Sequence, residues 1–292
     1  MVDHRLLKDH DYALVSAEHL LALPEGIPCQ RLTSQNFVNS DSLLPSLITL
    51  RELSEAQSIG LLEIMQSQIE QGHAPVITGL FKTDNTPEQV KAYFSRHQVC
   101  TNLKGETAWL RLHDPRVWVH LQRVLGDDLF ASLIHRIPHW TFFLCGEWRM
   151  WEYARVESLP MIYSYLSVDA AQWEDLQRIG LVNRCLRCLG LETFDEITRY
   201  SPGIQHQITH AQLKYQLTRA EDIVRYVHLA VQIHPQFDDH PVMREAHLRY
   251  QKLASQSKID EDESVVDAFN EIPSSQWPVI RAELNQTQPI AA

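Results

Sequence analysis

The chain has 292 residues, of which 44% are hydrophobic and 22% charged, a composition typical of a globular protein with a substantial core. Its formal net charge of −11 argues against binding to nucleic acid or to an anionic membrane surface, because both depend on clustered basic side chains. The N-terminus lacks an apolar signal core, and no stretch is apolar enough to span a membrane, so we expect a cytoplasmic protein. Five cysteines do not suggest a disulfide framework, so we expect reduced thiols.

Strand and helix patterns alternate through the first half of the chain. Apolar runs and alternating segments predict strands at 11–17, 28–32, 43–50, 75–81, 97–103, 106–112, 141–145 and 147–155. Helices are expected at 18–23, between Ser54 and Gly72, and at 86–96, 115–125 and 128–136. Because proline cannot donate to a strand ladder, Pro45 predicts that 43–50 is an edge strand or an extended segment.

From Ser167 onward the pattern becomes helical. Apolar spacing and capping residues predict helices at 167–190, 192–200, 206–217, 219–234 and 241–255. The change predicts an α+β protein in which a mixed, α/β-like N-terminal lobe precedes an all-helical C-terminal lobe. We assign residues 1–162 and 163–256 to these lobes, and 257–292 to an acidic link followed by a loosely ordered tail.

The most informative stretch joins a strand to a helix. Residues 107–112 alternate in polarity, as a half-buried strand does. Asp114 is a good helix N-cap, and Pro115 then occupies the first helical position, where proline is best tolerated. Arg111 and Arg116 flank this acid. We favour a structural role for the cluster, in which an arginine forks onto the carboxylate, over a binding patch in which an arginine pairs with an acid of a partner.

Tryptophans gather around the same part of the chain. Most of them are expected to be core residues, and any that is exposed would be an anchor for a protein partner, because tryptophan, tyrosine and arginine dominate interface energetics. The candidate partner-binding motif therefore contains four residues of the corner and three tryptophans: Arg111, Asp114, Pro115, Arg116, Trp118, Trp148 and Trp151.

Motifs for catalysis are scarce. The sequence has no G-x-S-x-G, no glycine-rich phosphate loop and no G-x-G-x-x-G. Cys185 and Cys188 form a C-x-x-C, but no second ligand pair follows, and the spacing lies inside a predicted helix, so we expect packed thiols. The fifteen histidines show no H-E-x-x-H spacing. We predict no catalytic residues, no cofactor and no metal ligands.

Five short segments, in this order, resemble the effector adaptor/chaperone family of the bacterial type VI secretion system, the Tap/Tec adaptors. The segments are Tyr12–Val15, Leu43–Leu47, Leu110–Val117, Ala220–Asp222 and His234–Pro241. The third resembles the most specific family motif, an aromatic-rich F-R-F-x-D-P-R-V, although this chain has leucine at both aromatic positions. The other segments are weak individually and count only together, over roughly residues 10–255.

The resemblance implies a non-enzymatic protein. Members of the family bind a cognate toxic effector and help to load it onto the spike protein of the secretion tube. An acidic chain without catalytic motifs is consistent with that role. Two alternatives stay open from the sequence: an immunity protein whose acidic surface covers the basic active site of a toxin, and a metal-dependent hydrolase with a histidine-rich site.

Overall fold

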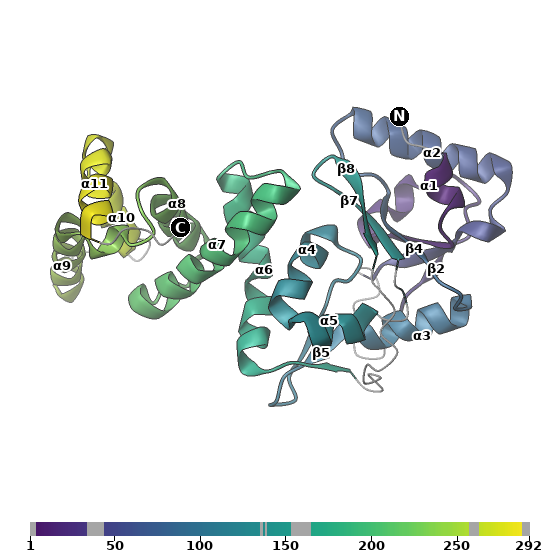
Figure 1. The fold of residues 1–292 in the computed structure, drawn as a ribbon, viewed down its shortest axis with the longest axis horizontal. Coiled ribbons are helices and arrows are strands. Elements are labelled where there is room, and N and C mark those ends of the chain that lie inside the picture. The colour runs from purple at the N-terminus through teal and green to yellow at the C-terminus, as the bar shows by residue number, and fades with distance from the viewer. Residues whose placement is uncertain are drawn as a thin grey trace. The chain divides into compact units, whose positions relative to one another are not determined.

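The computed structural model describes residues 4–33, 44–134, 137, 139–152, 165–256 and 263–287. The chain forms two compact units, Met1–Gln177 and Arg178–Ala292 (Figure 1). The first holds an antiparallel sheet and the second holds helices, which confirms the prediction of an α+β fold. The boundary predicted after residue 162 lies outside the described residues.

The first unit contains nine strands and several helices among its described residues. Its strands are β1 (Tyr12–Val15), β2 (Gln30–Arg31), β3 (Ser46–Thr49), β4 (Ile77–Lys82), β5 (Val99–Thr101), β6 (Thr107–Trp109), β7 (His139–Leu144), β8 (Glu147–Glu152) and β9 (Leu166–Ser167). Its helices are α1 (Arg5–Lys8), α2 (Glu55–Glu70), α3 (Pro87–His97), α4 (Pro115–Leu125) and α5 (Asp127–Ile134), with 3₁₀ turns η1 (Ala17–Ala22) and η4 (Leu50–Glu52).

Six strands form the main sheet, in the order β2-β3-β1-β4-β7-β8, with every neighbouring pair antiparallel. A smaller sheet has the order β6-β5-β9. The prediction of an edge position for the segment after Pro45 is wrong, because β3 pairs with both β1 and β2. Pro45 precedes the strand, so its missing N–H does not interrupt the ladder.

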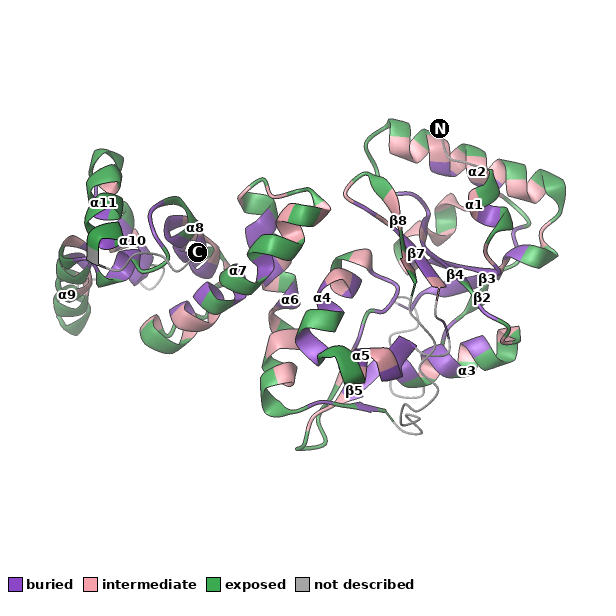
Figure 2. Cartoon of the chain, in the orientation of Figure 1, coloured by how far each residue is buried: buried purple, intermediate pink, exposed green. Residues whose placement is uncertain are grey.

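The main sheet is buried on both faces. Ala13 and Leu80 belong to an aliphatic cluster with Leu61 and Met65 of α2. On the opposite face Phe81 contacts Phe94 of α3, with ring centroids 5.7 Å apart. Figure 2 shows the central strands buried between helices that expose their outer sides. This two-sided burial explains why β1 reads as a continuous apolar run and not as an alternating one.

Gly79 in β4 has no room for a side chain. A Cβ at this position would lie 2.8 Å from Cε1 of Phe142, whose ring is fully buried. We expect Gly79→Ala to lower the free energy of unfolding by about 1–3 kcal/mol in urea titrations. Gly60→Ala is the control, because its Cβ would meet Pro24 at an ordinary 3.7 Å and alanine favours the α2 helix. Equal stabilities for the two variants would contradict this packing.

The second unit is helical in its described residues. Its elements are α6 (Ala170–Cys188), which contains the boundary between the units, α7 (Phe194–Tyr215), α8 (Ala220–Gln232), η5 (Phe237–Asp239), α9 (Pro241–Ser255), α10 (Val265–Asn270), η6 (Ser274–Gln276) and α11 (Trp277–Thr287). The predicted break between residues 200 and 206 is wrong, because α7 continues through Pro202. Ile204 and Ile208, which follow the proline, are buried in the core that holds this helix in place.

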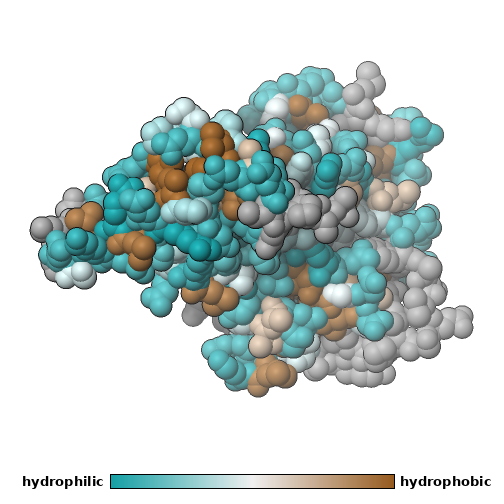
Figure 3. All heavy atoms as spheres, turned by 60° about the vertical axis from the view of Figure 1, so that its left-hand side comes forward, coloured by the Kyte–Doolittle hydropathy of each residue, from teal (hydrophilic) through white to brown (hydrophobic). Residues whose placement is uncertain are grey.

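The last part of the chain is more ordered than we expected. Val266 and Phe269 of α10 are fully buried, and Ile280 of α11 joins the same core. The prediction of a loosely ordered tail is therefore wrong for residues 263–287. The acidic run at 260–263 lies outside the described residues except for Glu263. Some large apolar side chains remain exposed, among them Leu213 and Leu248, and Figure 3 shows hydrophobic residues among the hydrophilic ones at the surface.

Candidate functional site

The corner before α4 has the capping geometry that the sequence predicts. Asp114 is the N-cap, and its Oδ1 accepts a hydrogen bond from the backbone N–H of Arg116 at 3.0 Å. Pro115 occupies the first helical position. The carbonyl of Asp114 accepts from the N–H groups of Val117 and Trp118 at 2.9 and 3.0 Å. Asp114 thus begins the helix through both its side chain and its backbone.

The same carboxylate holds two arginines. Arg116 donates from Nε to Oδ1 and from Nη2 to Oδ2 of Asp114, both at 2.9 Å. Nη2 of Arg111 lies 3.3 Å from Oδ2. Burial of Asp114, which is 5% exposed, opposes its ionisation, but the hydrogen bonds and charges of the arginines outweigh burial and lower its pKa. The acid is therefore ionised at neutral pH. The two nitrogens with which Arg116 could bind a partner's carboxylate in a bidentate pair already bind Asp114.

The three candidate tryptophans do not join this corner. Trp118 is 2% exposed, and its ring lies 4.5 Å from Trp140 and 4.8 Å from Phe142, centroid to centroid. It is a core residue, as most of the tryptophans were expected to be, and it offers no exposed anchor to a partner. Trp148 is partly buried against the aliphatic cluster beneath α2, whereas Trp151 contacts Phe142 edge-on at 5.9 Å. The two lie on opposite faces of β8.

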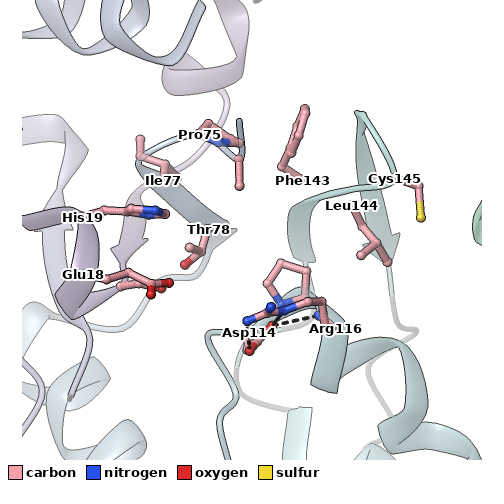
Figure 4. Close-up of a pocket in the computed structure, with 13 residues that line it drawn as sticks. Glu18, His19, Pro75, Ile77, Thr78, Asp114, Arg116, Phe143, Leu144 and Cys145 are labelled. Carbon is pink, nitrogen blue, oxygen red and sulfur yellow. Dashed lines mark hydrogen bonds and ion pairs between the residues drawn. The ribbon is translucent and has the colours of Figure 1, made fainter. Parts of the chain in front are cut away.

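A pocket lies beside the corner, at one end of the central strands (Figure 4). Its volume is about 270 Å³. It is lined by Ser16, Glu18, His19, Ala74, Pro75, Ile77, Thr78, Asp114, Pro115, Arg116, Phe143, Leu144 and Cys145. Three residues of the sequence-predicted motif thus form one side of a concave surface. Arg111, Trp118, Trp148 and Trp151 do not line it.

The pocket is apolar on one side and polar on the other. In Figure 4, Phe143 and Leu144 lie across the pocket from the polar side chains of Glu18 and His19, and Pro75 lies between the two sides. The wall at Leu144 ends in a two-residue turn, in which Cys145 and Gly146 have φ values of 58° and 81°. Positive φ at both central residues is typical of the tight turns that join antiparallel strands. This turn fixes the outer wall of the pocket.

Sequence reasoning missed Glu18, His19, Pro75 and Phe143. They come from η1, the segment before β4 and the end of β7, which are far apart in the chain. Each segment was predicted as a separate element, but no local pattern indicates that their ends meet. Only the strand order of the sheet brings these side chains together.

His113 lies next to the corner and stacks on Trp109, with ring centroids 5.5 Å apart. Burial lowers its pKa to about 4, although the charge of Asp114 raises the value. The unfolded chain takes up a proton near pH ~6.5 and the folded one only near the lower value, so stability falls as pH falls through this interval. Between about pH 7 and pH 4.5, the free energy of unfolding of the wild type is expected to fall by about 2–3 kcal/mol more than that of His113→Phe, which keeps a stacked ring but cannot be protonated. Urea unfolding at both pH values measures the difference. An unchanged pH dependence would contradict this.

A second polar cluster lies in the second unit and is built around Asp238. Its Oδ2 accepts from Nε2 of His210 at 2.9 Å, from Nζ of Lys214 at 2.7 Å and from the hydroxyl of Tyr215 at 2.8 Å. Asp238 is 2% exposed, and the neighbouring Phe237 is fully buried. The His234–Pro241 segment therefore fastens η5 to α7, which is a structural role.

The C-x-x-C motif is only partly packed. Cys185 is buried, and burial raises its pKa to about 12, which makes its thiol a poor nucleophile and metal ligand. Cys188 is exposed. Across the described ranges, no group of three or more histidine, cysteine, aspartate or glutamate side chains is arranged to hold a metal ion. Among the helices that the structure describes, none has the length and apolar character to cross a membrane.

The site is thus a small pocket whose polar side is formed in part by the Asp114-Pro115-Arg116 corner. Its concave, largely apolar form is typical of surfaces that receive a side chain of another molecule. Comparison of the chain with protein-family models, with curated proteins and with solved structures finds no match.

Proposed function

We propose that this protein is a non-enzymatic adaptor that binds a cognate toxic effector of a type VI secretion system in the cytoplasm and helps to load it onto the spike protein. The observation that carries the proposal is the position of the Asp114-Pro115-Arg116 corner. This corner is the most specific part of the family resemblance, and it lines a pocket that opens at the surface (Figure 4). A motif at such a position has a structural role and is also within reach of a partner.

The chemistry of the pocket supports binding more than catalysis. A nucleophilic hydroxyl or thiol needs a base within hydrogen-bond reach. Among the described residues, Nδ1 of His19 has no hydrogen-bond partner, and the hydroxyl of Thr78 donates to the carbonyl of Leu14 at 3.2 Å. Cys145 lies across the pocket from His19 in Figure 4. The wall offers apolar surface instead, which drives protein association.

Delivery assays distinguish an adaptor from an immunity protein. Deletion of the gene in the producing strain is expected to stop killing of susceptible neighbours by one effector, while the producing strain stays viable. The physical reason is that an adaptor acts before export and does not neutralise the toxin. Self-intoxication of the deletion strain would instead support the immunity alternative, and unchanged killing by every effector would contradict the proposal.

A further inference from the structure

We propose that the pocket receives one bulky apolar side chain from a segment of the protein partner, and that a lysine or arginine beside it pairs with Glu18. The inference rests on the proposed adaptor function, because it names the chemistry by which the partner is recognised. The pocket is the one lined by Glu18, Ala74, Phe143 and the Asp114–Arg116 corner.

The apolar part follows from the walls of the pocket. Pro75, Ile77, Phe143 and Leu144 lie around its opening (Figure 4). At about 270 Å³ the cavity lies near the lower end of the range typical of ligand pockets, roughly 300–1,000 Å³. A bulky aliphatic or aromatic side chain fits in a space of this size. Such an inserted side chain is typical of the anchors that dominate protein interfaces.

The basic part follows from the charged groups. Arg116 is the cation of the pocket, but Nε and Nη2 already bind both oxygens of Asp114. An acid on the partner would therefore compete with Asp114 for the charge of Arg116. Glu18 is exposed and lines the pocket. The hydrogen bond to Asp114 is the main cause that raises the pKa of Arg116, and the charge of Glu18 is the last, so Glu18 is only weakly paired with this cation. A chain with a net charge of −11 also favours a basic partner.

Two variants test the two parts separately. Ala74 is exposed at the rim, so Ala74→Trp is expected to fill the opening without disturbing the core, and Ala56→Trp in α2 is the matched control. Glu18→Lys reverses the charge, and Glu25→Lys makes the same change at an exposed site that does not line the pocket. Circular dichroism and urea unfolding of each variant test whether the fold is retained.

The probe is a random peptide library displayed on phage and selected against the full chain. We expect the selected peptides to combine a bulky apolar residue with a lysine or arginine. Ala74→Trp is expected to weaken the binding of these peptides by about 10- to 100-fold, and Glu18→Lys by about 3- to 10-fold. The two controls should bind as the wild type does.

The remaining outcomes each contradict one part of the proposal, either the apolar pocket or the basic residue. Equal binding to Ala74→Trp, or failure to select any peptide, overturns the pocket as a docking site. Selection of acidic peptides, or equal binding to Glu18→Lys, overturns the basic residue. The adaptor function is tested separately, by binding of the effector itself. If no effector binds the wild-type chain, the adaptor role is contradicted even if peptides enter the pocket. An effector that binds wild type and Ala74→Trp equally contradicts this inference alone.

Discussion

Replacing Asp238 with alanine is expected to lower the free energy of unfolding of the second unit by about 2–4 kcal/mol. The variant removes the single acceptor that His210, Lys214 and Tyr215 of α7 share. Breaking a buried ion pair on one side costs roughly 3–5 kcal/mol, because the remaining charge loses its partner. The loss here is smaller because Lys214 is 35% exposed and can be partly rehydrated.

Asp239→Ala is the matched control for this experiment. Asp239 follows Asp238 in the chain, but its side chain is 47% exposed, and its contacts with Lys214 and Arg244 are 3.2 and 3.7 Å long. Exposed pairs of this kind contribute about 0–1 kcal/mol. Urea unfolding followed by far-ultraviolet circular dichroism compares the variants. Equal losses at the two positions would contradict the role of Asp238 in fastening η5 to α7.

Acid should have the same effect as the Asp238 variant. Burial opposes ionisation of Asp238, but hydrogen bonds from Lys214, His210 and Tyr215 outweigh it and lower its pKa. The folded state therefore releases this proton more readily than the unfolded state does. The resulting stability is present above the pKa of the unfolded carboxyl, near ~3.9, and is lost as pH falls through the lower folded value.

Trp118→Ala is expected to destabilise the first unit by about 3–5 kcal/mol, the usual loss when a large aromatic side chain is removed from a core. The ring packs against Trp140, Phe142 and Phe130 with centroid separations of 4.5, 4.8 and 5.6 Å. Loss of these contacts leaves a cavity that the surrounding aromatic rings cannot fill without leaving their rotamers. Urea unfolding followed by tryptophan fluorescence and circular dichroism measures the change.

Trp118→Phe is the informative companion variant. The indole Nε1 of Trp118 is buried without a hydrogen-bond partner in the described part of the chain, so phenylalanine removes an unsatisfied donor as well as some volume. We expect a loss of less than about 1.5 kcal/mol. If Trp118→Ala instead weakened partner binding while the stability of the free protein stayed unchanged, the assignment of Trp118 to the core would be contradicted.

Features determined by nearby residues were predictable from the sequence. The helices expected to begin near residues 54, 86 and 115 do begin there, and Ser54, Thr86 and Asp114 are their N-caps. A cap depends on residues within one helical turn, so tertiary packing rarely overrides it. β5 and β6 pair where adjacent strands were predicted at 97–103 and 106–112, but both strands are shorter than predicted. The turn between them includes Gly105, whose φ is +80°.

Features determined by distant residues were not predictable. The pocket depends on the strand order of the sheet, which no local pattern encodes. The helix through Pro202 and the packed C-terminal helices were missed because burial of Ile204, Phe269 and Ile280 outweighs a local signal for a break or a tail. Trp118 was included in the candidate partner-binding motif because the sequence alone does not distinguish a tryptophan of the core from one of an interface.

The most direct test of the adaptor account is co-expression of this protein with each candidate effector encoded beside its gene, followed by affinity purification and sizing. The account predicts one stable, stoichiometric complex, with an effector that is insoluble or degraded when expressed alone. Ala74→Trp should reduce recovery of the complex, whereas Ala56→Trp should not. If no neighbouring protein co-purifies with the wild-type chain, and purified protein carries a stoichiometric transition metal, the adaptor account is contradicted and a hydrolase becomes the better explanation.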